Sequence, residues 1–482
     1  MNAIVMPPVD ESVIPRRDAI VAALRAVVGD AHVISAEDER RAYETDALTA
    51  YRAVPLAVVL PGSTEEVSEV LRILNREKVK VVARGAGTSL SGGALPSPDA
   101  VVVGLSRLNR ILDIDYGDRT ARVQTGVTNI NITNAVAHMG FFYAPDPSSQ
   151  LACTIGGNIA MNSGGAHCLK YGVTTNNVLG LRMVLMDGTI LDIGGDCLDA
   201  PGYDLLGLVI GSEGQLGVVT EATVRILRAA EGARPMLMGF ETAEAAGACV
   251  AAIIGSGIIP VALEYMDRPA IKVCEAFAHA GYPLDVEALL IIEVEGSETE
   301  IADLIERINA ISKRFNPSTT KVSKSEAESA AIWKGRKSAF GAMGRVADYI
   351  CMDGVIPTGR LPEVLRRVSD ICAGYGLQVA NIFHAGDGNL HPLVLYNMND
   401  PVEQEKAEAA GADILKFCVE VGGCLTGEHG VGIEKRDLMA IQFDAVDLTA
   451  QMRLKSVFDP DWLLNPAKVF PLEGRPAPFG QD

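Results

Sequence analysis

The pattern of apolar and polar residues in the first half of the chain predicts short buried strands joined by helices. An apolar run at residues 56–61 is followed by a helical pattern in which Ser63 and Glu66 stand at capping positions. A second apolar run at 78–83 completes a β-α-β unit, which favours a parallel pair of strands with a crossover helix. Further strands are expected at residues 100–105, 120–125, 181–186 and 217–226.

The pattern changes after about residue 232, where strands at 235–240, 261–266 and 289–294 alternate with acidic helices. With 482 residues, a chain of several domains is expected. We predict an α+β protein whose final prolines prevent a long terminal helix. The expected parts are a mostly helical lead-in at 1–52, a first domain at 53–231, a second α+β domain at 232–440, and a segment at 441–482 that packs back onto the first domain.

Composition excludes several classes of protein. A net charge of −19 argues against a nucleic-acid partner, because phosphate binding needs a basic surface. The beginning of the chain lacks the pattern of a signal peptide, and no uncharged apolar stretch reaches the ~18 residues of a membrane helix, so we expect a cytoplasmic protein. None of the nine cysteines has CxxC spacing, which removes the usual signature of zinc ribbons and iron–sulfur clusters.

Three glycine-rich turns in the first domain indicate a phosphate-containing ligand. The strand at 78–83 runs into residues 84–93, RGAGTSLSGG, where glycines let backbone amides close around an anion. Leu90 stands where the dinucleotide pattern GxGxxG needs glycine, and no GK[ST] follows, so this is neither of the two common nucleotide loops. Similar turns at 153–165 and 211–219 make three unrelated surface turns a poor explanation.

These turns resemble the FAD-binding domain of the vanillyl-alcohol oxidase/p-cresol methylhydroxylase family. The resemblance implies a two-part FAD-binding domain with an α+β substrate (cap) domain. Some members attach FAD through His or Cys; neither residue lies in 84–93, so we expect non-covalent FAD. The residues assigned to FAD are Arg84, Gly85, Ala86, Gly87, Thr88, Ser89, Pro145, Asp146, Ser149, Thr154, Gly156, Gly157, Asn158, Asn162, Gly164, Gly165, Gly214, Gly217 and Val218.

Two polar motifs near the end of the second domain predict a metal site. If Asp387-Gly388 is the turn of a β-hairpin, His384 pairs with His391 and the two imidazoles can bind one divalent ion. In the second motif, glycines flank Glu428 and His429, so that Glu428 can complete a His₂-carboxylate set while His429 remains a base. The alternative is a pair of core histidines with a capping Glu–His pair.

These motifs resemble the D-2-hydroxy-acid dehydrogenase branch of the same family, and especially the FAD-binding subunits of bacterial glycolate oxidases. The resemblance makes His384, His391 and Glu428 metal ligands and His429 the catalytic base. In D-2-hydroxyglutarate relatives a lysine stands near the position of Cys351, and its absence favours glycolate or D-lactate. The resemblance also implies iron–sulfur and sister flavoprotein-like subunits as electron acceptors. Through these subunits the protein would take a peripheral position at the inner membrane.

The expected reaction is oxidation of the 2-hydroxy acid to the 2-oxo acid by hydride transfer to FAD. Arg336 is the first choice to bind the substrate carboxylate, ahead of Lys337 and Arg345, and Asn389 would orient the substrate or a metal ligand. The ligand set suits Zn²⁺, Mn²⁺ or Fe²⁺. Three alternatives stay open: a stand-alone D-lactate or D-2-hydroxyglutarate dehydrogenase, a flavin-carrying electron-transfer or scaffold subunit, and a metallohydrolase.

Overall fold

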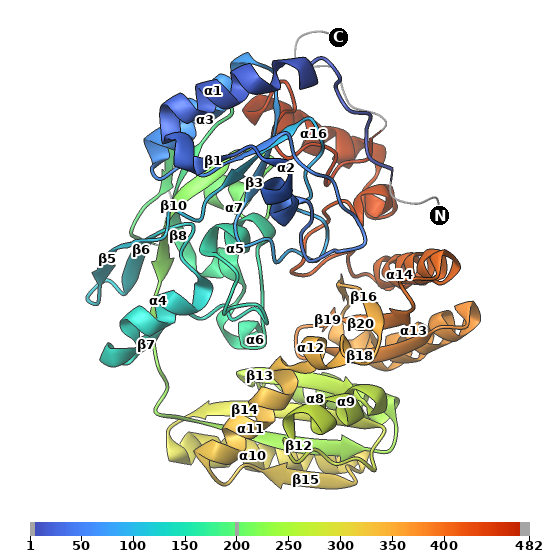
Figure 1. Ribbon diagram of the computed structural model, residues 1–482. Coiled ribbons are helices and arrows are strands. Elements are labelled where there is room, and N and C mark those ends of the chain that lie inside the picture. The colour runs from blue at the N-terminus through green and yellow to red at the C-terminus, as the bar shows by residue number, and fades with distance from the viewer. Residues whose placement is uncertain (1–4, 198–201, 473–482) are drawn as a thin grey trace. The chain divides into compact units, whose positions relative to one another are not determined.

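The computed structural model describes residues 5–197 and 202–472, and the chain divides into two compact units (Figure 1). The terminal unit comprises residues 5–164, 172–228 and 428–472, whereas the central unit comprises 165–171 and 229–427. Both units mix helices with sheets, which confirms the predicted α+β class. The domain boundaries drawn from the sequence stay a prediction, because compactness does not measure independent folding.

The terminal unit contains two main sheets. The first is four-stranded in the order β1-β2-β4-β3, and the second is a five-stranded antiparallel sheet in the order β5-β6-β10-β8-β9. The strands are β1 (Val33–Ile34), β2 (Ala57–Val59), β3 (Lys80–Arg84), β4 (Ala100–Gly104), β5 (Ile111–Asp115), β6 (Thr120–Gln124), β7 (Phe141–Phe142), β8 (Val178–Val184), β9 (Ile190–Gly194), β10 (Val218–Arg225) and β11 (Leu227–Arg228). The helices are α1 (Arg17–Val28), α2 (Glu37–Arg40), α3 (Thr64–Arg76), α4 (Asn129–Val136), α5 (Ile155–Met161), α7 (Leu205–Val209), α15 (Met439–Gln442) and α16 (Ala445–Phe458).

Helix α3 shows how the local sequence sets the first sheet. Ser63 caps its first turn by accepting a hydrogen bond from the backbone N–H of Glu66 at 3.1 Å, as predicted. Its apolar residues pack with α1 against the sheet in one core. The expected parallel strands are present, but they are not neighbours: β4 lies between β2 and β3 and is parallel to both.

The tail packs on the terminal unit through backbone and side-chain contacts. Leu464 forms a parallel bridge with Val81 of β3, and the N–H of Val81 donates to the carbonyl of Leu463 at 2.8 Å. The side-chain amide of Asn465 donates to the carbonyls of Gly93 and Glu213 at 3.0 and 2.6 Å. The end of the described chain thereby fastens two of the glycine-rich turns.

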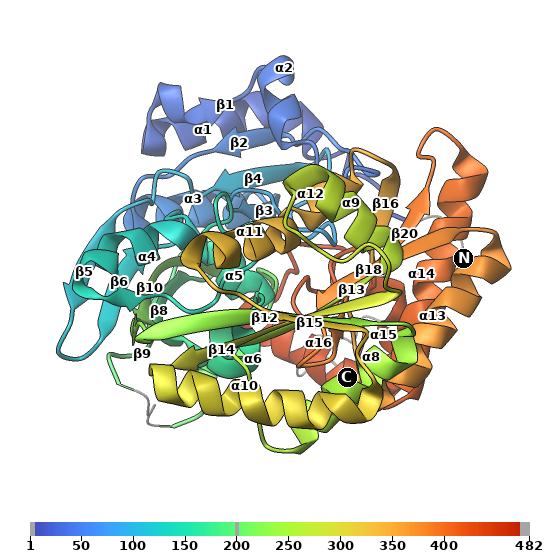
Figure 2. The ribbon, with the colours of Figure 1, turned by 90° about the horizontal axis from the view of Figure 1, so that it is seen from below.

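The central unit is built on a nine-stranded sheet. Helices α9, α11 and α12 share one apolar core with the sheet, and α8 and α10 lie on the opposite face (Figure 2). The strands are β12 (Gly232–Phe240), β13 (Ala262–Asp267), β14 (Ala288–Gly296), β15 (Thr319–Val322), β16 (Asp348–Cys351), β17 (Gly354–Val355), β18 (Gln378–His384), β19 (Asn389–Leu390) and β20 (Pro392–Tyr396). The helices are α6 (Cys168–Tyr171), α8 (Ala243–Gly255), α9 (Arg268–Ala278), α10 (Glu298–Ser312), α11 (Glu326–Lys337), α12 (Ala339–Met343), α13 (Leu361–Tyr375) and α14 (Pro401–Glu420).

The strands predicted from apolar runs are confirmed, with ends that differ by a few residues. Strands β5 and β9 were not predicted, because their partly exposed residues include aspartates that break the apolar run. Within residues 5–197 and 202–472, no helix has both the length and the apolar character needed to span a membrane.

Candidate functional site

A cavity of about 430 Å³ lies in the terminal unit where strand β3 ends and the first glycine-rich turn begins. Its lining includes Gly85, Ala86 and Thr154 from the turns singled out in the sequence. It also includes polar residues that the sequence did not single out: Ser106, Asn109, Thr128 and Asn131. These polar side chains lie in the segments that follow β4 and β6, with Asn131 in α4, and only the fold brings them together.

The glycine at position 85 is required by a close approach between two turns. A Cβ atom on Gly85 would lie 2.3 Å from Oγ1 of Thr154, which is closer than any real contact. The Thr154 side chain is buried, and its Oγ1 makes no hydrogen bond to any described residue. A buried hydroxyl without a partner beside a glycine-lined cavity fits a ligand that carries hydrogen-bonding oxygens, such as a pyrophosphate.

Several other residues assigned to FAD hold the turns in place. The guanidinium of Arg84 donates to the carbonyl of Thr45 at 2.8 Å, so Arg84 links the first glycine-rich turn to the segment that contains Thr45. The Asn158 side chain accepts a hydrogen bond from the Asn129 amide at 3.0 Å, inside the unit. Asn162 adopts a left-handed conformation at the end of α5.

Three further residues assigned to FAD, Gly217, Val218 and Gly165, lie where packing or chain position constrains them. A Cβ on Gly217 would meet the Met183 side chain at 2.2 Å, and Val218 is buried in β10. Gly165 lies in the central unit, one residue beyond the part of this turn that belongs to the terminal unit.

Two histidines meet in the central unit. The rings of His384 and His391 lie 5.2 Å apart in an edge-to-face arrangement, and ligand atoms of the two are within 4.8 Å of each other. Both side chains are buried. The proximity agrees with the sequence argument, although the pairing that predicted it is wrong.

The hairpin register differs by two residues from the predicted one. His384 pairs with Asn389 and Asn381 pairs with Pro392, so the partner of His384 is two residues earlier than predicted and the centre of the turn lies one residue earlier. Continuing this register places Ile382 opposite His391. Because side chains alternate with a period of two, His384 and His391 still share one face as diagonal neighbours.

Both imidazoles use Nδ1 to contact the protein. Nδ1 of His384 lies 2.8 Å from Oε1 of Glu264, its direct cross-strand neighbour between β13 and β18. Nδ1 of His391 lies 3.4 Å from the carbonyl oxygen of Met352. Since both neighbours are acceptors, each Nδ1 is the donor in its contact. A histidine held in this way through Nδ1 can bind a metal ion only through Nε2.

Glu264 is the functional candidate that the sequence analysis missed. It is fully buried, and its second oxygen, Oε2, lies 2.5 Å from Nη2 of Arg336. Burial disfavours its ionisation, but Arg336 and His384 outweigh this and hold the pKa of Glu264 below its ordinary value. One carboxylate therefore joins a predicted metal ligand to the predicted substrate-binding arginine. A single glutamate within a run of apolar strand residues gives no sequence signal of this role.

Arg336 is buried on α11, with 2% of its surface exposed, whereas Lys337 and Arg345 are exposed. Its Nε makes no hydrogen bond to a described residue, so the guanidinium retains capacity for an anion in addition to Glu264. Arg336 therefore does not lie on a solvated face of the helix.

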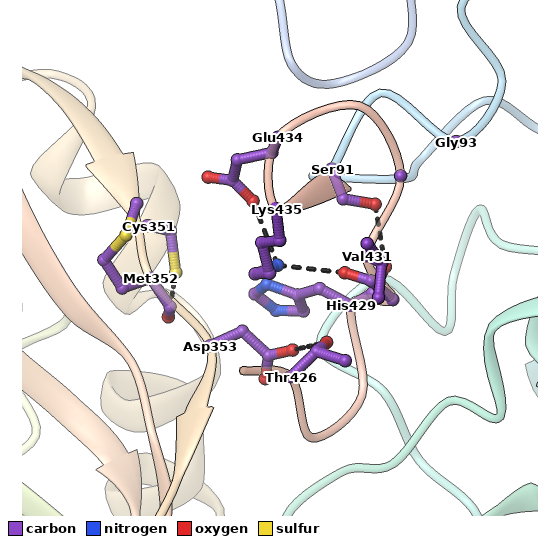
Figure 3. A network of polar contacts seen from close by, with 12 residues as sticks. Ser91, Gly93, Cys351, Met352, Asp353, Thr426, His429, Val431, Glu434 and Lys435 are labelled. Carbon is purple, nitrogen blue, oxygen red and sulfur yellow. Dashed lines mark hydrogen bonds and ion pairs between the residues drawn. The ribbon is translucent and has the colours of Figure 1, made fainter. Parts of the chain in front are cut away.

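Asn389 and Gly427 pack against each other near the histidine pair. A Cβ on Gly427 would lie 2.6 Å from Cγ of Asn389, and Oδ1 of Asn389 is buried without a hydrogen bond to a described residue. The backbone N–H of Gly427 donates to the side chain of Asp353 at 2.9 Å. Asp353 also accepts a hydrogen bond from Thr426 (Figure 3). Glu428 is the next residue in the chain, so these contacts fix the position of the backbone from which its side chain extends.

Comparisons with known proteins agree with this site. Residues 55–194 match the family described as FAD binding domain, and residues 230–469 match the family described as FAD linked oxidases, C-terminal domain. The chain is 48% identical to the glycolate oxidase subunit GlcD of Escherichia coli over 96% of this chain and 93% of that protein. It is 32% identical to a D-lactate dehydrogenase of Archaeoglobus fulgidus over 91% of this chain and 96% of that protein.

Solved structures support the fold. A 4-ethylphenol oxidase from Gulosibacter chungangensis has a TM-score of 0.79 at 18% identity, covering 97% of this chain and 99% of that chain. A p-cresol methylhydroxylase has a TM-score of 0.78 at 16% identity, covering 98% of this chain and 100% of that chain. The fold predicted from the glycine-rich turns is therefore confirmed. The chain has the fold of p-cresol methylhydroxylase. It belongs to the FAD-linked oxidases, and it is an FAD-dependent oxidoreductase.

Proposed function

We propose that the protein oxidises a small 2-hydroxy acid, glycolate or D-lactate, to the 2-oxo acid, as the catalytic subunit of a glycolate oxidase assembly. The observation that carries this proposal is the 48% identity to GlcD over nearly the full length of both chains. The partners would be an iron–sulfur subunit and a sister flavoprotein-like subunit that accept the electrons. A stand-alone D-lactate dehydrogenase is the second candidate, favoured by relatives at 32% identity.

FAD would bind non-covalently in the terminal unit, along the cavity lined by Gly85, Ala86 and Thr154. The unsatisfied Thr154 hydroxyl and the absence of side chains on the glycines support this site. Bound FAD supplies the acceptor for the hydride equivalent that leaves C2 of the substrate.

A divalent ion would be held by His384, His391 and Glu428. The support is the buried imidazole pair with both Nδ1 atoms turned to protein acceptors, and the tethering of Gly427 immediately before Glu428. Two neutral imidazoles and one carboxylate suit Zn²⁺, Mn²⁺ or Fe²⁺. Such an ion supplies a Lewis acid that lowers the pKa of the 2-hydroxyl group.

The protein groups would divide the remaining tasks. Arg336 binds the substrate carboxylate, and Glu264 restrains both Arg336 and His384. Asn389 offers its buried Oδ1 to the substrate or to a ligand. His429 accepts the hydroxyl proton as general base, a role that typically contributes about 10²–10⁴-fold to the rate.

Anaerobic reduction of bound flavin with glycolate, D-lactate, L-lactate and D-2-hydroxyglutarate tests the proposal. We expect glycolate or D-lactate to bleach the flavin fastest. His429→Ala should slow this bleaching about 10²–10⁴-fold while FAD stays bound, and His138→Ala, an exposed histidine, should have no effect. Unchanged reduction in His429→Ala would contradict the proposal and favour a scaffold subunit. An active chain purified without partners from its host would favour the stand-alone enzyme.

A further inference from the structure

The loop that carries His429 is held by side chains from two glycine-rich turns of the terminal unit. Oγ of Ser91 donates to the carbonyl of His429 at 3.0 Å (Figure 3). The backbone N–H groups of Val431 and Gly432 both donate to the carboxylate of Glu213, at 2.6 and 2.8 Å. Besides Ser91, a buried carboxylate of the third turn, residues 211–219, therefore holds the loop.

The geometry of the loop is that of an anion-binding nest. Gly430 and Gly432 have φ angles of 82° and 53°, and the amides of Val431 and Gly432 converge on the Glu213 oxygens. A Cβ on Gly430 would come within 2.9 Å of the Glu213 carboxylate. Nζ of Lys435 closes the loop from the other side by donating to the carbonyl of Gly430 at 2.9 Å (Figure 3).

The backbone of Glu213 is itself held on both sides of the peptide unit. Its backbone N–H donates to the carbonyl of Ala160 at 2.8 Å, and its carbonyl accepts from the Asn465 side chain at 2.6 Å. Burial raises the pKa of Glu213, whereas the amides of Val431 and Gly432 and the charges of Lys435 and Lys468 favour the ionised form. A fixed carboxylate thus faces a backbone that contains two left-handed glycines.

Two unfavourable features coincide at this residue. Glu213 has φ = 54°, a conformation that residues with a side chain rarely adopt, and it places a carboxylate in the interior. A turn that only had to bind a cofactor by its backbone would need glycine here and no charge. The features are explained if the carboxylate is needed to fix the loop two residues after His429.

We propose that Glu213 is a positioning residue for His429, acting through the backbone amides of Val431 and Gly432. This inference rests on the proposed function, in which His429 is the general base. Misplacement of a reacting group by about 1 Å costs on the order of 10²-fold in rate. Glu213→Gln replaces one accepting oxygen with an NH₂ group that repels an amide N–H, so the loop must shift.

The experiment is a double-mutant cycle in the FAD-loaded protein, read as the limiting rate of flavin reduction. Glu213→Gln should lower this rate about 10²-fold, with KM for the substrate and the FAD content changed less than about twofold. In the His429→Ala background it should cause no further loss. Glu221→Gln, a carboxylate on β10 with a weak ion pair to Arg122 at 3.7 Å, is the matched control and should leave the rate unchanged.

Equal losses in both backgrounds, or a loss that appears only as a raised KM or missing FAD, would overturn the inference. If His429→Ala alone leaves the rate unchanged, the proposed function fails instead. Should Glu213→Gln not yield folded protein, Glu213→Asp keeps the charge but withdraws it by one methylene. It must then lower the rate in the native background and have no effect beside His429→Ala.

Discussion

Replacing Glu264 with glutamine removes the buried negative charge that pairs with Arg336 and His384 in the central unit. Glu264 is 0% exposed, with Oε1 at 2.8 Å from Nδ1 of His384 and Oε2 at 2.5 Å from Nη2 of Arg336. Glutamine keeps the volume but leaves the guanidinium buried without a counter-charge. Removing one partner of a buried pair costs about 3–5 kcal/mol. Because glutamine can still accept one hydrogen bond, we expect the free energy of unfolding to fall by about 3 kcal/mol.

The assay uses the two tryptophans of the chain, Trp333 in the central unit and Trp462 in the terminal unit. In a Trp462→Phe background, Trp333 fluorescence during urea unfolding reports the central unit alone. Glu287→Gln is the control, since its ion pair with Arg268 is half exposed and should contribute less than about 1 kcal/mol. The divalent ion proposed for His384, His391 and Glu428 should bind roughly 10–100-fold more weakly in Glu264→Gln, as measured by metal titration.

The double variant Glu264→Gln with Arg336→Met decides whether the reasoning is sound. It leaves no buried charge at this point, and exchange of a buried ion pair for neutral groups of similar size is often close to neutral. We therefore expect it to be more stable than Glu264→Gln alone. A loss below about 1 kcal/mol in the single variant, or no recovery in the double variant, would refute the importance assigned to the pair.

Two further predictions concern the terminal unit. Gly85→Ala should weaken FAD binding by at least about tenfold without changing the circular dichroism, because its Cβ would overlap Oγ1 of Thr154 at 2.3 Å; Gly255→Ala, with open space around it, is the control, and equal affinities would contradict the packing argument. Burial lowers the pKa of Lys468 from 10.5 to about 7, so between pH 7 and 10.5 the unfolded chain binds one proton more than the native one. Above pH 7 the free energy of unfolding of the native protein should therefore rise, relative to that of Lys468→Met, by about 1.4 kcal/mol per pH unit. Below pH 7 the difference between the two proteins should stay constant. A difference that is also constant from pH 7 to 9, measured by urea unfolding, would exclude a neutral buried amine.

Sequence reasoning predicted the strands most directly where their apolar runs are continuous. The strands that became β4 and β14 are buried on both faces, and a buried strand with helices on its faces has no need of polar alternation. Strands β5 and β9 were not predicted because exposed aspartates interrupt their apolar residues. The order of strands in the sheet could not be predicted, since nothing local places β4 between β2 and β3.

In the candidate site, too, the local sequence predicted some features, whereas contacts between distant residues could not be predicted. The histidine pair survived an error of two residues in register, because the face of a strand depends only on whether the shift is even or odd. Glu264 could not be found in this way, because it meets His384 across 120 residues of sequence. Glu213 was interpreted only as part of a cofactor turn, whereas its contacts to Val431 and Gly432 span 218 and 219 residues.

The fastening of Gly93 by Asn465 sets a limit on when the cofactor pocket can be completed. The two residues are 372 positions apart, so a ribosome adding about 5–20 residues per second needs roughly 20–75 s to supply the second after the first. During that interval the amide that closes the turn does not yet exist. FAD can therefore enter a finished pocket only after Asn465 has been synthesised, and the edge of the sheet at β3 lacks its contact with Leu464 until the same stage.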